Sequence, residues 1–144
     1  MNFCSGVSTF VASGVLIMNM SKLSKEYLNK CRVALSEEQA QSLSNSNNWE
    51  HVERDKVHKD WDTLYKELAT YIDIAKCNSN KVQGIIEKHY QIACRFYTPS
   101  KEAYIGMGIF YQENQDMKVF HNTYHPQMVN FLADSISEFA IKKL

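Results

Sequence analysis

The chain has 144 residues, of which 44% are hydrophobic and 12% are aromatic. This length and composition fit one folded domain with its own core, and they exclude a disordered chain. Lys and Arg balance Asp and Glu at a net charge of +0, so no overall field attracts the chain to nucleic acid or to an anionic membrane.

The N-terminal stretch is apolar over residues 10–18, before the first Lys or Arg. It is too short to span a bilayer, and a secretory signal would need a positive charge in front of it. We therefore expect residues 1–20 to form a non-structural N-terminal extension, and we hypothesise that translation starts at Met18 or Met20.

The four cysteines show neither a C-x-x-C motif nor paired Cys/His spacing: Cys4, Cys31, Cys77 and Cys94. Such scattered cysteines indicate reduced thiols in a cytoplasmic protein rather than a disulfide framework or a zinc site.

Residues 21–48 predict short helices and a flexible loop. Apolar residues at helical spacing predict an amphipathic helix over residues 21–33. Ser36 and Gln39 fit a capping box, which predicts the start of a second short helix. Residues 44–48 are all Ser or Asn, which is typical of a loop.

Residues 49–75 predict one long helix or two helices end to end. The first half is mostly polar. From Trp61 onward, apolar residues recur at i, i+3, i+4 and i+7 and form a wide stripe: Trp61, Leu64, Tyr65, Leu68, Ile72 and Ala75.

The next helix is expected to begin with Asn80 as its N-cap, and its apolar stripe runs through Phe96 and Tyr97. His89 lies inside this stripe, and two interpretations stay open. It is either a core or cleft-edge histidine held by a hydrogen bond, or a residue that contacts a ligand.

Residues 101–112 predict a helix, with Thr98 as the cap and Pro99 at the first position. Gly106 and Gly108 lie in its interior, where each costs about 1 kcal/mol relative to Ala. Glycine allows another backbone or a bulky ligand to come close. We interpret the pair as a sign of close helix packing, with approach of a ligand as the alternative.

The C-terminal region predicts a short helix over residues 116–120 and a last helix over residues 126–143. His121 and His125 are four residues apart, but Pro126 disfavours helical geometry at His125, so we expect no metal pair. The whole pattern predicts an all-α fold with six or seven helices and no strand.

The motifs that catalysis or nucleotide binding would require are absent: G-x-S-x-G, the P-loop, G-x-G-x-x-G and H-E-x-x-H. The sequence has neither a helix-turn-helix signature nor a basic stripe. We therefore expect neither an enzyme nor a nucleic-acid-binding chain, and no cofactor. The density of aromatic residues instead predicts an apolar cleft for a large, flat ligand.

Two C-terminal stretches carry a family pattern: FYTPSKEAYIGMGIFY at residues 96–111 and FHNTYHPQMVNFLADSI at residues 120–136. They resemble the TipAS-type antibiotic-recognition domain, which is the C-terminal drug-binding half of TipA-like MerR regulators. The resemblance covers residues 49–142, so we expect the ligand-binding domain over residues 49–144. Its traits include Trp61 at a helix start, His89-Tyr90, a Y-x-G-[LM]-G-x-x-Y helix from Tyr104 to Tyr111, Phe120, His125-Pro126 and F-L-x-x-[AS]-I from Phe131 to Ile136.

The resemblance implies a globin-like helical fold with a cleft for macrocyclic peptide antibiotics such as thiopeptides. It implies drug sensing or sequestration by a stand-alone domain, without the DNA-binding half of full-length relatives. Helices before Trp61 are expected to fold over the ligand. The cleft candidates are Trp61, Tyr65, His89, Phe96, Tyr104, Met107, Phe110, Tyr111 and Phe120.

Gly106 stands at about the place where the thiostrepton-binding prototype of that family has its reactive cysteine. We therefore expect reversible rather than covalent binding.

Two alternatives stay open. One is haem binding through His89. The other is a protein-interaction or dimerisation module that buries its aromatic face and takes no small ligand. The sequence predicts no oligomeric state.

Overall fold

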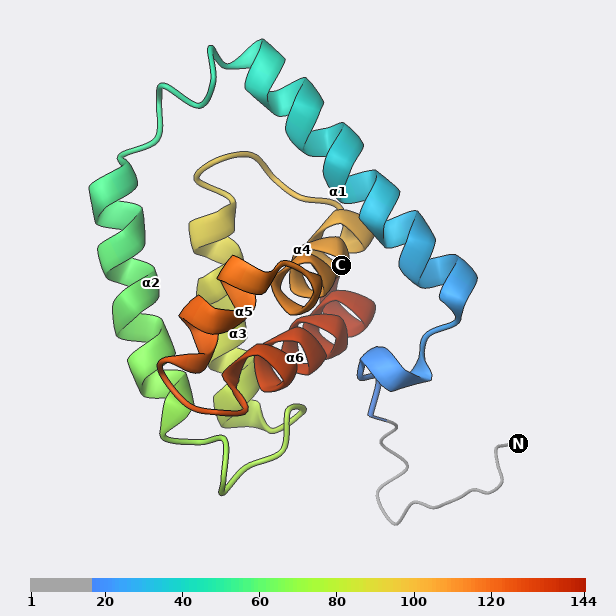
Figure 1. The fold of residues 1–144 in the computed structure, drawn as a ribbon, viewed down its shortest axis with the longest axis vertical. Coiled ribbons are helices and arrows are strands. Elements are labelled where there is room, and N and C mark those ends of the chain that lie inside the picture. Colours follow the sequence, from blue (N-terminus) through green and yellow to red (C-terminus); the bar gives the residue numbers. More distant parts are fainter. Residues whose placement is uncertain (1–16) are drawn as a thin grey trace.

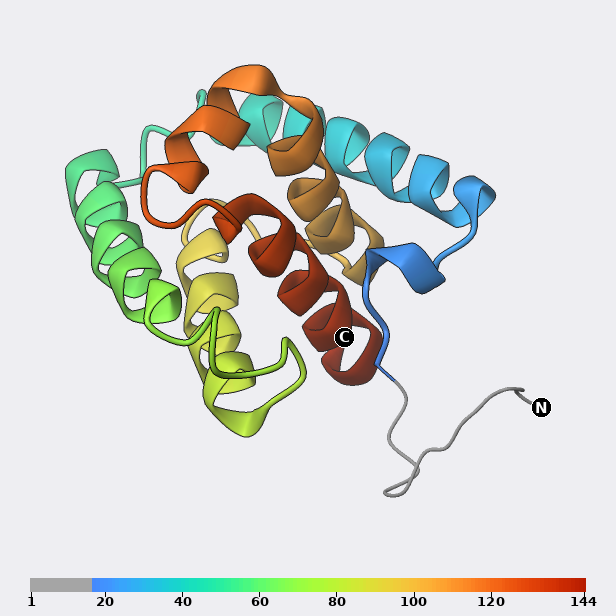
Figure 2. The ribbon, with the colours of Figure 1, turned by 60° about the horizontal axis from the view of Figure 1, so that its bottom comes forward.

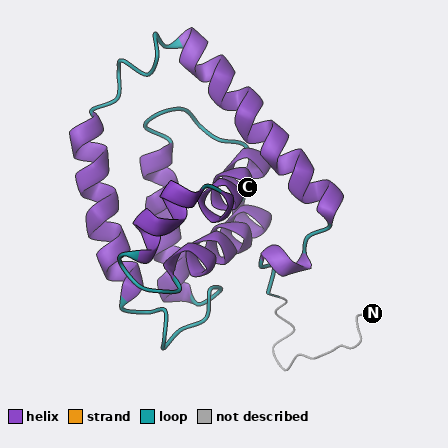
Figure 3. Ribbon diagram, in the orientation of Figure 1, coloured by secondary structure: helices purple, strands orange, loops and turns teal. Residues whose placement is uncertain are grey.

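The computed structural model describes residues 17–144, and the expectations for residues 1–16 lie outside this part of the chain. The described chain is all-helical, which confirms the predicted fold class, and it contains no strand (Figure 3). In order, the elements are the 3-10 helix η1 (Met20–Lys22) and the α-helices α1 (Lys25–Asn45), α2 (Arg54–Ala69), α3 (Asn80–Ala93), α4 (Lys101–Glu113), α5 (Gln115–Asn122) and α6 (Met128–Lys143).

Helix α4 lies at the centre of the fold, with α1 on one side and α6 on the other (Figure 1). Its two glycines make this packing possible. A Cβ at Gly106 would lie 2.3 Å from the carbonyl oxygen of Cys31 in α1, and a Cβ at Gly108 would lie 3.3 Å from the Cα of Ala133 in α6. The interpretation of the glycine pair as close helix packing is therefore confirmed.

Helices α1 and α2 lie at the edge of the molecule, with the C-terminal helices between them (Figure 1, Figure 2). Helix α2 packs mainly against α3, and α3 in turn packs against α6. Tyr104, Leu132 and Ile136 are among the largest fully buried side chains of the core that these helices share. Over residues 17–144, no helix has both the length and the hydropathy that crossing a bilayer needs.

Helix α1 is a single helix of 21 residues, so the prediction of two short helices over residues 21–48 is wrong. Ser24, not Ser36, is the N-cap, and its side chain accepts a hydrogen bond from the amide of Tyr27. No Gly or Pro interrupts the segment from Lys25 to Asn45. Glu38, from the expected capping box, instead accepts hydrogen bonds from the amide and the hydroxyl of Ser100 at the start of α4.

A left-handed turn joins α1 to α2, so the helix predicted from residue 49 begins only at Arg54. Asn47, Asn48 and Trp49 have φ values of 51°, 59° and 62°. This conformation is uncommon for a residue as bulky as tryptophan. Hydrogen bonds hold Trp49 in place, because its indole N–H donates to Ser42 Oγ at 2.9 Å and its amide donates to Ser46 Oγ at 3.2 Å.

Other predicted boundaries shift by a few residues. Ser79, not Asn80, caps α3, and Ser100, not Thr98, caps α4. Helix α3 ends at Ala93, so Phe96 lies in the following turn. Helix α5 extends to Asn122, two residues beyond the predicted end, and α6 begins at Met128.

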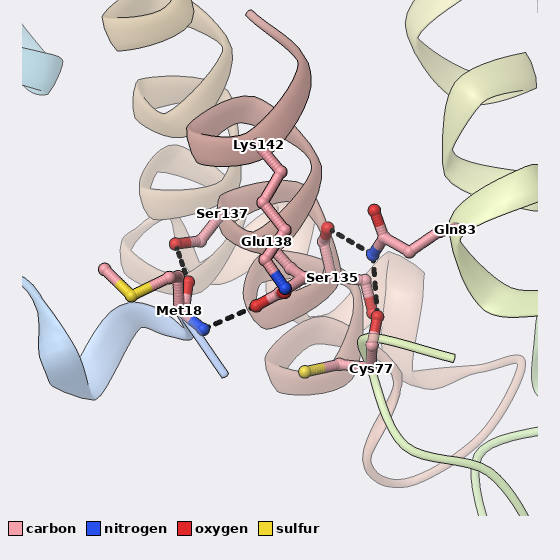
Figure 4. A network of polar contacts seen from close by, with 7 residues as sticks. All are labelled: Met18, Cys77, Gln83, Ser135, Ser137, Glu138 and Lys142. Carbon is pink, nitrogen blue, oxygen red and sulfur yellow. Dashed lines mark hydrogen bonds and ion pairs between the residues drawn. The ribbon is translucent and has the colours of Figure 1, made fainter. Parts of the chain in front are cut away.

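Hydrogen bonds join the segment before α1 to the C-terminal helix α6 (Figure 4). The amide of Met18 donates to Glu138 Oε2 at 2.5 Å, and Ser137 Oγ donates to the carbonyl oxygen of Met18 at 2.5 Å. Lys142 forms an ion pair with the same buried Glu138. Met20 is buried, so the expected non-structural extension is wrong for residues 18–20.

Candidate ligand-binding site

The described residues line an open cavity of about 410 Å³ between α2, α5 and the end of α4. Aromatic rings dominate its wall, and only a few polar atoms face it. The lining residues are His58, Trp61, Asp62, Tyr65, Tyr111, Met117, Phe120, His121 and Tyr124.

Helical spacing explains why these residues share one wall. His58, Trp61, Asp62 and Tyr65 stand at i, i+3, i+4 and i+7 along α2, so they lie on one face of that helix. Helix α5 contributes Met117, Phe120 and His121 by the same rule. Asn114 caps α5 by accepting a hydrogen bond from the amide of Met117, which fixes where this short helix begins.

A chain of hydrogen bonds joins two residues of the wall, Tyr65 and His121, to two buried residues behind it, His89 and Tyr104. Tyr104 Oη lies 2.9 Å from His89 Nδ1, and His89 Nε2 lies 3.1 Å from Tyr65 Oη. Tyr65 Oη also lies 3.2 Å from His121 Nε2, and His121 Nδ1 lies 2.7 Å from the carbonyl oxygen of Met117.

The direction of this chain follows from its last member. A carbonyl oxygen only accepts, so His121 Nδ1 carries the hydrogen and donates to Met117. In neutral His121, Nε2 then accepts from the Tyr65 hydroxyl. Tyr65 in turn accepts from His89 Nε2–H, and His89 Nδ1 accepts from the Tyr104 hydroxyl. Every member is satisfied when both histidines are neutral.

Burial enforces this neutral state. It lowers the pKa of His89 to about 3, with a smaller contribution from nearby His121. Burial also lowers the pKa of His121, against the opposing effect of its bond to Met117. Burial raises the pKa of Tyr65 and of Tyr104 well above the ordinary phenol value. The floor of the cavity is therefore uncharged at neutral pH.

His89 is thus a core histidine held by hydrogen bonds at both ring nitrogens. It is fully buried, and neither nitrogen is free to coordinate haem iron. His121 and His125 occupy different environments, because His125 Nε2 lies 3.0 Å from Asp73 Oδ2, outside the cavity wall.

The nine cleft candidates separate into three groups in the structure. Trp61, Tyr65, Tyr111 and Phe120 line the cavity. The second group lies behind the wall: His89, fully buried Tyr104, and Phe96, whose ring stacks on Trp61 at a centroid distance of 5.9 Å.

The third group lies away from the cavity. Phe110 is 45% exposed, and Met107 is partly buried against the core, but neither lines the cavity wall.

Sequence reasoning did not select five of the lining residues: His58, Asp62, Met117, His121 and Tyr124. The position of His58, three residues before Trp61, was the one signal for its inclusion, because it continues the same helical face. Asp62 lies on the same helical face, but a charged residue does not stand out in an apolar stripe. Met117, His121 and Tyr124 were not identified because the contact between α2 and the segment around α5 joins residues more than 50 positions apart.

Asp62 is the one carboxylate in the wall. The Tyr124 hydroxyl donates to its Oδ1 at 2.6 Å, and Lys66 Nζ lies 3.0 Å from its Oδ2. The hydrogen bond from Tyr124, followed by the contact with Lys66, lowers the pKa of Asp62 below its ordinary value. The carboxylate is therefore ionised at neutral pH.

No thiol of the described chain lines this cavity: Cys31, Cys77 and Cys94 all lie elsewhere. Burial raises the pKa of Cys31 and of Cys77 to about 11 and also raises the pKa of Cys94. A thiol must ionise to act as a nucleophile, so the raised pKa values disfavour nucleophilic attack by these groups at neutral pH.

Comparison with protein families gives a match to the TipAS antibiotic-recognition domain over residues 22–139. The match includes α1, which lies before the resemblance over residues 49–142. Neither the comparison with curated proteins nor that with solved structures gives a match. Because the family match covers most of the chain, the protein belongs to the TipAS family of antibiotic-recognition domains.

Proposed function

We propose that this domain binds bulky, largely apolar antibiotics, macrocyclic peptides among them, reversibly in the aromatic cavity between α2 and α5. Such binding would serve drug sensing or sequestration. The observation that carries the proposal is the aromatic wall itself, in a chain of the antibiotic-recognition family. Trp61, Tyr65, Tyr111, Phe120 and Tyr124 offer ring faces for stacking and apolar burial.

The cavity volume limits how such a ligand is held. About 410 Å³ lies within the range of pockets that enclose drug-sized molecules. A macrocyclic peptide is larger than this, so we infer that one aromatic arm enters the cavity while the ring rests outside. Phe120 is 46% exposed and provides an apolar contact for the outer part of the ligand.

An unpaired polar group supports a binding role. The buried indole nitrogen of Trp61 has no hydrogen-bond acceptor within residues 17–144. An unsatisfied buried donor costs about 1–3 kcal/mol. Locally destabilising features such as an unsatisfied donor are common at functional sites.

Reversibility is supported by the cysteines. The three described thiols lie outside the cavity wall, with pKa values raised by burial. Gly106 stands near the position of the family's reactive cysteine and is packed against α1. We therefore expect no mass increase after the complex is denatured.

The experiment is a thermal-shift screen of the full chain against thiopeptides and other macrocyclic peptide antibiotics. Two phenylalanines of nearly equal exposure supply matched variants. Phe120→Ala should lose most of the ligand-induced rise in Tm, because Phe120 lines the cavity. Phe110→Ala should keep it, because Phe110 does not. No shift with any compound, or equal loss in both variants, would contradict the proposal.

A further inference from the structure

The cavity wall carries a negative charge and no lysine or arginine to balance it. Asp62 is its one carboxylate, and neither Lys nor Arg lines the wall. The hydrogen-bond chain through Tyr65 keeps His121 neutral, because His121 Nε2 is the acceptor that the Tyr65 hydroxyl needs. The fixed charge in the wall is therefore negative.

One partner of Asp62 lies in the cavity wall, and the other is an exposed lysine outside the wall. The Tyr124 hydroxyl, which also belongs to the wall, bonds to Oδ1 at 2.6 Å. Lys66 bonds to Oδ2 but is 69% exposed and not part of the wall. Exposed ion pairs on a helix contribute little to stability, so a ligand cation can replace Lys66 at small cost.

The rings next to this carboxylate add a second attraction for positive charge. Tyr124 lies 5.4 Å from Tyr65 and 5.7 Å from Phe120 between ring centroids. Neither pair is parallel, since the interplanar angles are 53° and 83°, so the rings offer faces in different directions. Aromatic faces attract cations within about 6 Å of the ring centroid, and the attraction grows as the cation loses water.

Resting on the proposed function, we propose that the cavity selects ligands that carry an organic ammonium group on an aromatic body. Asp62 pairs with the ammonium group, and the rings of Tyr65, Phe120 and Tyr124 surround it. The aromatic body of the ligand fills the rest of the cavity against Trp61 and Tyr111. Neutral ligands of the same shape bind more weakly, because they offer the Asp62 carboxylate no positive charge.

The test compares two probes that differ by one atom. Benzyltrimethylammonium and neopentylbenzene have nearly the same shape, but the first carries N⁺ where the second carries carbon. We expect the full chain to bind the ammonium probe about fivefold to tenfold more tightly in NMR titrations, and we expect added salt to reduce this preference.

Two variants on α2 separate the carboxylate from a general charge effect. Asp62→Asn should remove most of the preference, mainly by weakening the binding of the ammonium probe. Glu67→Gln removes one negative charge from an exposed position outside the wall and should keep the preference. Loss of the preference in both variants would mean that net charge, not the site, is responsible, and would overturn the proposal.

The other outcomes are equally decisive. If neopentylbenzene binds as tightly as the ammonium probe, the cavity has no preference for cations, although the proposed function stands. If neither probe binds, the cavity does not take small ammonium ligands and the inference is overturned. The proposed function is judged separately by the macrocycle screen with Phe120→Ala and Phe110→Ala.

Discussion

At the scale of single residues, Gly106 and Gly84 give opposite expectations for the same change. Gly106→Ala should lower the free energy of unfolding by about 1–3 kcal/mol, because the new Cβ would meet the Cys31 carbonyl oxygen at 2.3 Å and Leu35 Cβ at 2.9 Å. Gly84→Ala should raise it by about 0.5–1 kcal/mol, because nothing lies within 4 Å and Ala favours the helix. Urea denaturation measures both. Stabilisation by Gly106→Ala would show that α1 does not pack this closely on α4.

His89 gives a prediction about pH. Its pKa is about 3 in the folded protein and 6.5 in the unfolded reference state. Between these two pKa values, the unfolded chain binds a proton at His89 and the folded chain does not. The stability is therefore full above about pH 6.5 and falls as the pH falls toward 3. The expected slope for this group is about 1.4 kcal/mol per pH unit.

His89→Gln tests this account, because glutamine keeps hydrogen-bonding capacity but does not titrate. The variant should be less stable at neutral pH by about 1–3 kcal/mol, since the bonds to Tyr65 and Tyr104 are disturbed. Its stability should fall less steeply with acid, as measured by urea denaturation across the pH range. An equal flattening in the surface variant His58→Gln would contradict the account.

The sequence indicated which aromatic residues gather near one another, but not which atoms face the cavity. The stripe of α2 that carries Trp61 and Tyr65 also carries Leu64 and Leu68, which belong to the core. Both kinds of residue look alike in a hydrophobic pattern. Tyr104 shows the same difficulty, because its hydroxyl is satisfied by buried His89 and its ring never reaches the cavity.

At the scale of helices, two exposed serines, one at the N-cap of α1 and one inside it, test where that helix begins. Ser24→Ala should cost about 1 kcal/mol of unfolding free energy, because the Ser24 side chain accepts from the amide of Tyr27. Ser36→Ala should change stability by less than about 0.5 kcal/mol, because Ser36 lies on the exposed face within the helix. Chemical denaturation compares the two. A larger loss of stability for Ser36→Ala would indicate that Ser36 caps a second helix and that α1 is not one continuous helix.

Helix boundaries were predictable where a residue such as proline strongly disfavours continuing the helix. Pro99 indicates a new helix start, and α4 begins at the predicted Lys101, although its cap is Ser100 and not the predicted Thr98. The α1 to α2 junction was not predictable in this way. Its turn uses Asn47, Asn48 and Trp49 in left-handed conformation, and tertiary contacts rather than glycine make this possible. The ring of Trp49 packs on Phe96 at 5.0 Å, a contact between residues far apart in sequence.

At the scale of the whole molecule, the fold class followed from the scarcity of Gly and Pro and from the helical periodicity. An aromatic cleft was also expected, but its position did not follow from the sequence, because it forms where α5 meets α2 and no local pattern describes that contact. The sequence supplied Trp61, Tyr65, Tyr111 and Phe120 as candidates. Asp62, which gives the wall its charge, and Tyr124, which donates a hydrogen bond to it, are brought together by the tertiary structure.

The most direct test of the central claim is an NMR titration that follows the two tryptophan indole N–H signals, the chain having two tryptophans. Trp61 lines the cavity, whereas Trp49 lies at the α1 to α2 turn and bonds to Ser42. A Trp49→Phe variant assigns the signals. If a macrocyclic antibiotic enters the cavity, the Trp61 signal should move most, and Phe120→Ala should weaken the response. A titration in which binding moves the Trp49 signal alone, or in which neither signal moves, would contradict the account.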